Sequence, residues 1–276
     1  MTPTSPSPSH SPSPSPSPSP SPLALVTGAS SGIGKAFAER LAKDGYGLIL
    51  VARRRERLEE LAASLPATDV EVVSADLSTD AGIDTVAGLC ADRPLTTLVN
   101  NAGVAHYMPL AQLPAVKARE LVNVKVTAPT MLTRAALPGM IERGTGTVVN
   151  IAGMLAFSGP ATQQAGRAVY AGTLAHAVAM SQTLHAELAG TGVNAHVVCP
   201  GLVATEFHEV QGIDLSAVPR MSPEDVVAAA LAGIELGEVV SAPGVEDYGL
   251  LTTVFEADLA AFEGQSPQLA SRYRTH

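Results

Sequence analysis

The chain has 276 residues, of which 46% are hydrophobic and 16% charged, and its formal net charge at pH 7 is −9. This length is enough for one large domain or two small ones with a sizeable core. The acidic charge, without any basic run, argues against nucleic acid as a partner.

Other classes of protein are excluded by what the sequence lacks. Two cysteines, Cys90 and Cys199, are too few for a disulfide framework or a four-cysteine zinc site. No cluster of His, Cys, Asp and Glu has metal-ligand spacing, so we expect no metal. Neither a membrane-spanning apolar run nor a signal-peptide pattern is present, and we therefore expect no membrane association and a cytoplasmic location.

The first 22 residues form a Ser-Pro repeat that holds nine of the 21 prolines and no charged residue. Proline fixes φ and removes amide donors, so this repeat predicts a disordered tail rather than a helix or strand. The tail could serve as a docking tether or phosphorylation target, but an inert extension is the favoured interpretation.

Short apolar runs and longer helical patterns alternate along the rest of the chain. The runs predict strands at residues 23–26, 48–51, 70–74, 95–100, 147–151, 193–199 and 238–241. The helical patterns predict helices at residues 33–43, 55–65, 81–90, 115–142, 170–188, 224–236 and 250–262. Within the fourth helical pattern, Pro129 and Pro138 predict kinks or breaks.

These strands are continuous apolar runs, which is typical of strands covered on both faces. Alternation with helices predicts an α/β fold with a doubly wound, Rossmann-like parallel sheet. No linker divides it, so we expect a single domain over residues 23–245. A helical extension follows at residues 246–276.

A glycine-rich turn joins the first predicted strand to the first predicted helix. Glycine allows the sharp turn and the close approach of a phosphate to the free N–H groups at a helix N-terminus. Such spacing alone is weak evidence, but its position after the first strand predicts a dinucleotide site. The residues concerned are Gly28, Ser30, Ser31, Gly32, Ile33 and Gly34.

Four segments in order resemble the classical short-chain dehydrogenase/reductase family over nearly all of residues 23–245. They are Thr27–Gly34, Asn100–Gly103, Tyr170 and Pro200–Thr205. The resemblance implies that Asp76 and Leu77 lie at the adenine. It further implies cofactor-side roles for Asn101, Ala102, Gly103, Pro200, Gly201, Val203 and Thr205, and a substrate loop at residues 206–221.

The charge at the end of the second predicted strand indicates which cofactor binds. NAD sites usually carry a carboxylate there, whereas this chain has Arg53 and Arg54. A guanidinium suits the 2′-phosphate of NADP(H), with Arg53 the first expected contact and Arg54 the next. The alternative is a solvated basic helix start.

The catalytic positions only partly match the family. Tyr170 matches the tyrosine that exchanges a proton with the substrate oxygen, and Asn123 matches the helix asparagine of the proton relay, although it could be an ordinary buried residue. Leu174 stands where the family has lysine, and Gly153 stands where it has serine.

Replacements for these two groups are not obvious from the sequence. Ser158 lies on a loop, Arg167 has an unknown direction, and His106 is expected as a neutral residue on the pocket wall. Lys125 is two residues from Asn123, and residues so spaced do not share a helix face. Lys125 is therefore predicted to be a poor substitute for the missing lysine.

The altered site favours reduction over oxidation. Ionising an unperturbed tyrosine at pH 7 costs about 4 kcal/mol, which burdens oxidation, whereas the neutral acid needed for reduction is already present. We therefore expect an NADPH-dependent reductase of a small ketone or aldehyde, assembled as a homodimer or homotetramer as the family implies. A nucleotide-binding protein with non-redox chemistry, such as dehydration or cyclisation, or with a regulatory role, is the alternative.

Overall fold

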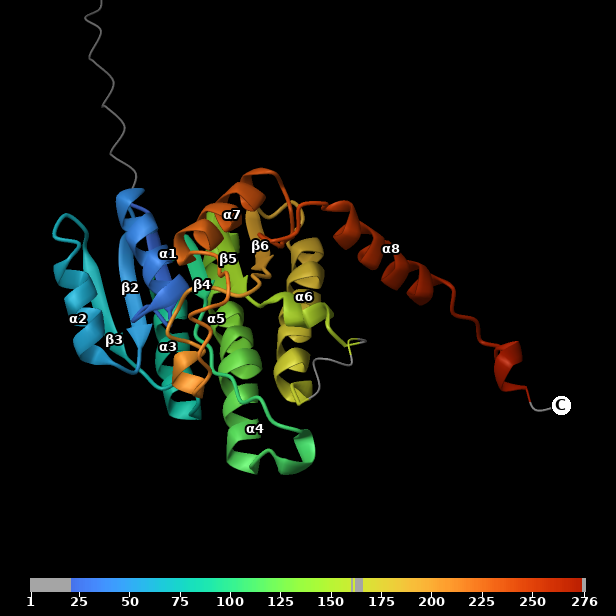
Figure 1. Ribbon diagram of the computed structural model, residues 1–276. Coiled ribbons are helices and arrows are strands. Elements are labelled where there is room, and N and C mark those ends of the chain that lie inside the picture. Colours follow the sequence, from blue (N-terminus) through green and yellow to red (C-terminus); the bar gives the residue numbers. More distant parts are fainter. Residues whose placement is uncertain (1–20, 160, 162–165, 275–276) are drawn as a thin grey trace, which may run out of the picture.

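A single seven-stranded sheet organises the chain, as Figure 1 shows for the computed structural model. The structure describes residues 21–159, 161 and 166–274. The predicted tail at residues 1–22 therefore lies almost wholly outside the described residues. The strands are β1 (Leu23–Thr27), β2 (Gly47–Ala52), β3 (Val70–Ser74), β4 (Thr97–Asn100), β5 (Gly146–Ile151), β6 (Val193–Val198) and β7 (Val240–Ser241).

All neighbouring strands of this sheet are parallel, in the order β3-β2-β1-β4-β5-β6-β7. The chain moves outward from β1 to β3 and then crosses back to β4 on the other side of β1. Such a reversal opens a crevice at the carboxyl ends of β1 and β4, where doubly wound folds bind their ligands. The predicted Rossmann-like fold is thereby confirmed.

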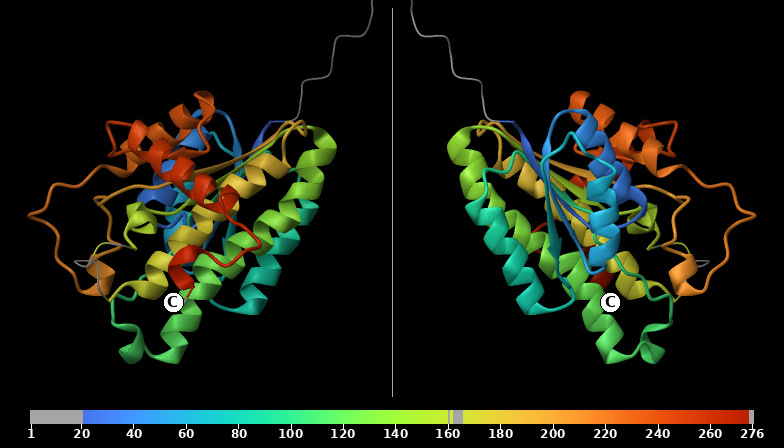
Figure 2. Two further views of the ribbon diagram at one scale, coloured as in Figure 1. Left: turned by 90° about the vertical axis from the view of Figure 1, so that its right-hand side faces the viewer. Right: turned by 90° about the vertical axis from the view of Figure 1, so that its left-hand side faces the viewer.

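Helices cover both faces of the sheet (Figures 1 and 2). One face carries α1 (Gly32–Lys43), α2 (Arg55–Ala63) and α7 (Pro223–Glu235), and the other carries α3 (Asp80–Asp92), α4 (Ala115–Val122), α5 (Ala128–Arg143) and α6 (Ala168–Glu187). Because both faces are covered, successive residues of β1 and β2 are mostly apolar. Ala24 and Val26 join one core cluster, while Leu25 joins the other.

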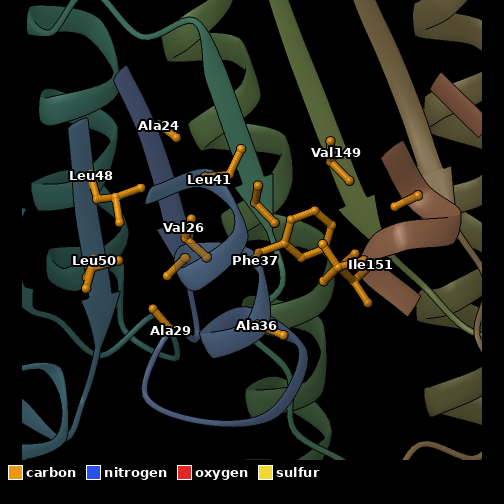
Figure 3. Packing of buried hydrophobic residues seen from close by; sticks show 14 of the residues in the cluster. Ala24, Val26, Ala29, Ala36, Phe37, Leu41, Leu48, Leu50, Val149 and Ile151 are labelled. Carbon is orange, nitrogen blue, oxygen red and sulfur yellow. The ribbon is translucent and has the colours of Figure 1, made fainter. Parts of the chain in front are cut away.

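The core beneath α1 holds the start of this helix close to the sheet. Figure 3 shows Phe37 reaching from α1 across the strands toward Ile151, with the small side chains of Ala29 and Ala36 near the turn. Phe37 is among the largest fully buried side chains. Small residues at the turn let the helix N-terminus lie directly over the ends of β1 and β2.

The segment from α4 to α5 is one continuous helical path with a wider turn inside it. A π-helical turn at Asn123–Thr127 joins the two α-helices. Pro129 is the second residue of α5 and directly follows the π-helical turn, so the predicted break does not occur there. The helix continues through Pro138, where a kink or break was predicted.

The last α-helix, α8 (Gly249–Glu263), runs away from the sheet in Figure 1, and a short 3-10 turn at Ser271–Tyr273 follows it. Leu251 is its only buried residue, and the ring of Phe255 contacts that of Phe157 at 6.2 Å between centroids. No helix among the described residues is long and apolar enough to cross a membrane.

Candidate active site

A pocket of about 770 Å³ lies at the carboxyl ends of the strands, over the crevice between β1 and β4. The residues that line it include the glycine-rich turn and Arg54 as well as Tyr170 and Phe207. Of the predicted site residues, all but Gly34 and Asn123 line it; those that do are Gly28, Ser30, Ser31, Gly32, Ile33, Arg53, Arg54, Asp76, Leu77, Asn101, Ala102, Gly103, Tyr170, Pro200, Gly201, Val203 and Thr205.

The turn after β1 needs its glycines for two different reasons. Gly28 has φ +67°, and a Cβ there would lie 2.8 Å from Asn101 Nδ2. A Cβ on Gly34 would lie 2.4 Å from the carbonyl oxygen of Gly28. Gly34 therefore lets α1 pack against the turn instead of lining the pocket, which explains why it is the one glycine of the motif set back from the cavity.

Side chains from two neighbouring strands lock this turn in place. Thr27 Oγ1 accepts hydrogen bonds from the amides of Asn101 and Ala102, each at 3.0 Å. Asn101 Nδ2 in turn donates to the carbonyl oxygens of Thr27 and Gly28. The segment after β4 thus supports the turn after β1, so its role includes structure as well as pocket lining.

The N-terminus of α1 opens onto the pocket, where the Glu206 carboxylate also bonds to the Ser31 side chain. Ser31 precedes the helix in an extended conformation and makes no side-chain capping bond, and the first turn contains no acidic residue. The free N–H groups and the partial positive charge of a helix start favour an anion at this point. The cradle therefore fits the pyrophosphate of a dinucleotide.

The two adjacent arginines face different partners. Arg54 Nη2 donates to Ser30 Oγ at 2.9 Å and to Ser31 Oγ at 3.1 Å, and it pairs with Glu206. Arg53 is 60% exposed, and its guanidinium lies 3.9 Å from the Glu120 carboxylate. Both line the pocket, but Arg54, predicted as the second contact, is the one joined to the phosphate turn.

Asp76 lines the pocket at the end of β3. Its Oδ1 accepts a hydrogen bond from the Ser78 amide at 2.9 Å. Burial acts to raise the pKa of Asp76, but the hydrogen bonds from Ser78 outweigh it and hold this pKa below its usual value. The side chain is therefore an ionised acceptor at neutral pH, suited to an amine or hydroxyl donor.

Asn123, predicted as part of a proton relay, is not brought to the pocket. Its Nδ2 donates to the Ser78 carbonyl oxygen at 2.8 Å and so ties the end of α4 to the loop after β3. Lys125 lines the pocket instead and is only 8% exposed. Residues two apart lie on opposite sides of a helix, so the prediction had the right spacing but the wrong residue facing the site.

Tyr170 lies in the first turn of α6, at the pocket wall, and its side chain is only 7% exposed. The ring of Tyr107 meets it edge-on, with 5.4 Å between centroids, and Lys125 Nζ lies 5.8 Å from its centroid. Burial, followed by the neighbouring Tyr107, raises the pKa of Tyr170 above its usual value. Tyr170 is thus a neutral phenol that can donate a proton or a hydrogen bond.

Gly153 and Leu174 face each other beside this tyrosine. Leu174 is 1% exposed, and a Cβ added to Gly153 would lie 3.4 Å from Leu174 Cδ1. An apolar contact therefore fills the place where the family resemblance led us to look for serine and lysine. Ser158 lines the pocket too, but its hydroxyl donates to the Leu155 carbonyl oxygen at 2.8 Å.

His106 does not line the pocket, contrary to the prediction. Its Nε2 lies 2.9 Å from Glu120, which also pairs with Lys117. The histidine at the pocket is His208, on the loop after β6, where its ring lies 5.4 Å from that of Phe207. His208 was missed because nothing in an irregular loop sequence shows which side chains face inward.

Two more groups complete the wall near Tyr170. Arg167 lies over the ring of Tyr107, with its guanidinium carbon 4.8 Å from the centroid. Tyr107 stands after the turn that follows β4, and its ring also lies 6.5 Å from that of His208. Within the residues that the structure describes, no group of three or more His, Cys, Asp or Glu could hold a metal ion.

The sequence is similar to proteins whose fold has a site of this kind. The family model for short chain dehydrogenases matches residues 22–214. A curated but uncharacterised oxidoreductase of Staphylococcus epidermidis is 31% identical over 211 residues, which cover 76% of this chain and 89% of that protein. The very-long-chain 3-oxoacyl-CoA reductase of Mus musculus is 31% identical, over 77% of this chain and 68% of that protein. The chain belongs to the short-chain dehydrogenase/reductase family.

Solved structures place it among oxidoreductases of this family. A short-chain dehydrogenase from Sphingobium yanoikuyae in complex with NADPH has a TM-score of 0.86 and 34% identity, covering 91% of this chain and 100% of that one. An alcohol dehydrogenase from Comamonas testosteroni, described as specific for bulky-bulky ketones, has a TM-score of 0.83 and 29% identity. That match covers 92% of this chain and 99% of the Comamonas chain.

Proposed function

We propose that the protein is an NADPH-dependent reductase of ketones or aldehydes. The observation that carries the proposal is that one pocket is lined both by a phosphate cradle with Arg54 and by the neutral phenol of Tyr170. The NADPH complex of the Sphingobium relative supports the choice of cofactor.

The residues present fit this cofactor. The α1 N-terminus would hold the pyrophosphate, Asp76 the adenine, and Arg54 with Ser30 and Ser31 the 2′-phosphate. When bound, NADPH supplies the hydride for the carbonyl carbon. The chain's own part is to seat the carbonyl oxygen at Tyr170, to exclude water, and to provide a proton for that oxygen.

We propose a carbonyl compound with sizeable apolar groups as the substrate class. The substrate end of the pocket is lined by Leu155, Phe207, Val210, Ile213 and Leu215. Apolar walls bind apolar groups by removing them from water. The ketone specificity of the Comamonas relative and the acyl substrates of the mouse relative point in the same direction.

The protein is also proposed to act in the cytoplasm as a homodimer or homotetramer. The outer side of α6 carries small side chains, including exposed Gly172, Ala175 and Ala179, which would allow a second helix to pack closely.

Because Gly153 and Leu174 replace two catalytic groups, a second function stays open: nucleotide binding with non-redox chemistry or a regulatory role. An NADPH-oxidation screen over aryl and long-chain ketones and aldehydes, with acetone as a small control, separates the two. We expect turnover of the bulky carbonyls and little turnover of acetone. Tight NADPH binding with no turnover across the screen would reject the reductase and favour the second function.

A further inference from the structure

Lys125 is a buried ammonium group in the wall of the catalytic pocket. It lies in the π-helical turn between α4 and α5 and is 8% exposed. Among the described residues, no carboxylate pairs with it and no hydrogen bond reaches its Nζ. Unpaired charges are rarely buried because they lose their hydration, so this lysine calls for a role inside the pocket.

The position of Lys125 suits contact with a bound carbonyl oxygen. Its Nζ lies 5.8 Å from the centroid of the Tyr170 ring, and a Cβ on Gly103 would lie 3.3 Å from it. The ammonium group therefore lies over the face of the phenol ring. Lys125 and Tyr170 line the same pocket, so both groups face a carbonyl compound that is bound there.

Burial affects the two candidate acids in opposite ways. A proton leaving Tyr170 would create a phenolate in a buried place, and burial raises the pKa of Tyr170 accordingly. A proton leaving Lys125 would create a neutral amine, and burial lowers the pKa of Lys125 to about 8. At pH 7 a group with that pKa is still about nine-tenths protonated and is a far stronger acid than an ordinary lysine.

We propose that Lys125 is the proton donor of the reduction, while Tyr170 holds the carbonyl oxygen by a hydrogen bond. This inference rests on the proposed reductase function. As the carbonyl carbon receives hydride from NADPH, the C=O π bond breaks and the oxygen takes a proton from Lys125 Nζ. The alcohol, NADP⁺ and a neutral amine result, and water then reprotonates the amine.

Other titratable or charged groups face this part of the pocket and must be separated from Lys125 in any pH profile. They are Tyr170 on α6, Arg167 just before α6, Tyr107 after β4, and His208 after β6. Burial, then Arg220 and Arg167, lower the pKa of His208, so its titration falls below that of Lys125. Burial raises the pKa of Tyr107, which titrates above it.

The decisive experiment compares Lys125→Met and Lys125→Arg in the full-length protein. We expect kcat/KM for ketone reduction to fall tenfold per pH unit above about pH 8 in the unmodified protein. Both variants should lose about 100-fold or more at pH 7, because neither methionine nor arginine can release a proton there. The exposed residue at the C-terminal end of α1 provides a matched control, Lys43→Met, which should behave like the parent.

The Lys125→Arg variant keeps the positive charge but cannot donate a proton at pH 7, so it distinguishes the two roles. If Lys125→Arg restores the rate to within a few-fold, the positive charge suffices and Lys125 is not the donor. If the fall near pH 8 persists in Lys125→Met, the proton comes from another group. Either result overturns the proposal. Tyr170→Phe should weaken catalysis but keep the fall near pH 8.

A second readout needs no cofactor or substrate. Acetylation of amines in the unloaded protein, followed by mass spectrometry across pH 6–11, measures where Lys125 loses its proton. A midpoint near pH 8 supports the proposal, and a midpoint like that of the surface lysines overturns it. An unmodified protein that binds NADPH but reduces no carbonyl would instead reject the reductase function itself, whatever the labelling shows.

Discussion

At the scale of single residues, neighbours in the sequence have separate tasks. Arg54 reaches the hydroxyls of Ser30 and Ser31, whereas Arg53 lies beside Glu120 and is largely exposed. Asn123 and Lys125 differ in the same way: Asn123 bonds to the loop after β3, whereas Lys125 lines the pocket. Side-chain direction therefore decides which member of each pair can meet a ligand.

Arg54→Met should weaken NADPH binding by about 10- to 100-fold, because a charge-assisted hydrogen bond contributes about 1.5–3 kcal/mol. NADH has no 2′-phosphate, so its affinity should change less than threefold. Fluorescence titration with both cofactors measures the two values. The control is Arg55→Met, since Arg55 pairs with Glu59 at 3.0 Å away from the cradle. An equal loss of affinity for both cofactors would show that Arg54 does not bind the 2′-phosphate.

Gly153→Ser should add a donor for the carbonyl oxygen and raise kcat/KM for ketone reduction about tenfold. The backbone there is extended, and the new Cβ would make ordinary contacts of 3.4 Å with Leu174 Cδ1 and 3.6 Å with the Pro200 carbonyl oxygen. Gly153→Ala adds the same Cβ without a hydroxyl and is the matched control. Equal rates for the serine and alanine variants would contradict the prediction.

At the scale of elements, the loop after β6 is fastened to α2 through one carboxylate. Glu206 accepts hydrogen bonds from Arg54 and Arg57, the latter at 2.7 Å. Burial acts to raise the pKa of Glu206, but the hydrogen bonds from both arginines hold it at about 2. Because this pKa is depressed by folding, the interaction stabilises the fold above the unfolded-state value of about 4.3 and is lost as pH falls toward 2.

Glu206→Gln should therefore lower the free energy of unfolding by about 1 kcal/mol at pH 7, a modest value because the arginines are partly exposed and screened. Below about pH 2 the difference should vanish, because the parent carboxyl is then protonated. Urea unfolding at several pH values measures both. The control, Glu59→Gln, removes an exposed pair within α2. A difference that stays constant down to pH 2 would show that charge is not the cause.

At the scale of the whole molecule, the sheet begins where the Ser-Pro repeat ends. Leu23 is the first residue of β1, its backbone pairs with Thr96 Oγ1, and the carbonyl oxygen of Pro22 accepts from the Gly47 amide. Every ladder contact of β1 thus comes from Pro22 onward. At the other end, α8 extends from the body and exposes Phe262 at 69%.

Deletion of residues 2–21 should leave the melting temperature within about 1–2 °C of the full-length value, since a Ser-Pro repeat lacks the amide donors needed to join the sheet. Differential scanning calorimetry of the two proteins measures this. NADPH affinity should be unchanged as well. A fall of more than a few degrees would show that the repeat packs on the domain.

The order of strands and helices could be predicted from the sequence alone, and so could the glycine-rich turn after β1. Strand and helix patterns are local, and the turn from β1 into α1 is specified by neighbouring residues such as Gly28 and Gly32, so both can be predicted without knowing distant contacts. The strand alternation and the parallel sheet are accordingly confirmed. Arg53, Arg54, Asp76 and Tyr170 line the pocket, and their roles there stay predictions.

Only the tertiary structure decided which groups surround Tyr170. Lys125 reaches the pocket because a π-helical turn places it there, and His106 is held by Glu120 on α4, away from the cavity. Both outcomes depend on helix rotation and on partners far apart in the sequence. The direction of a side chain is set by how whole elements pack, and residue spacing alone does not contain that information.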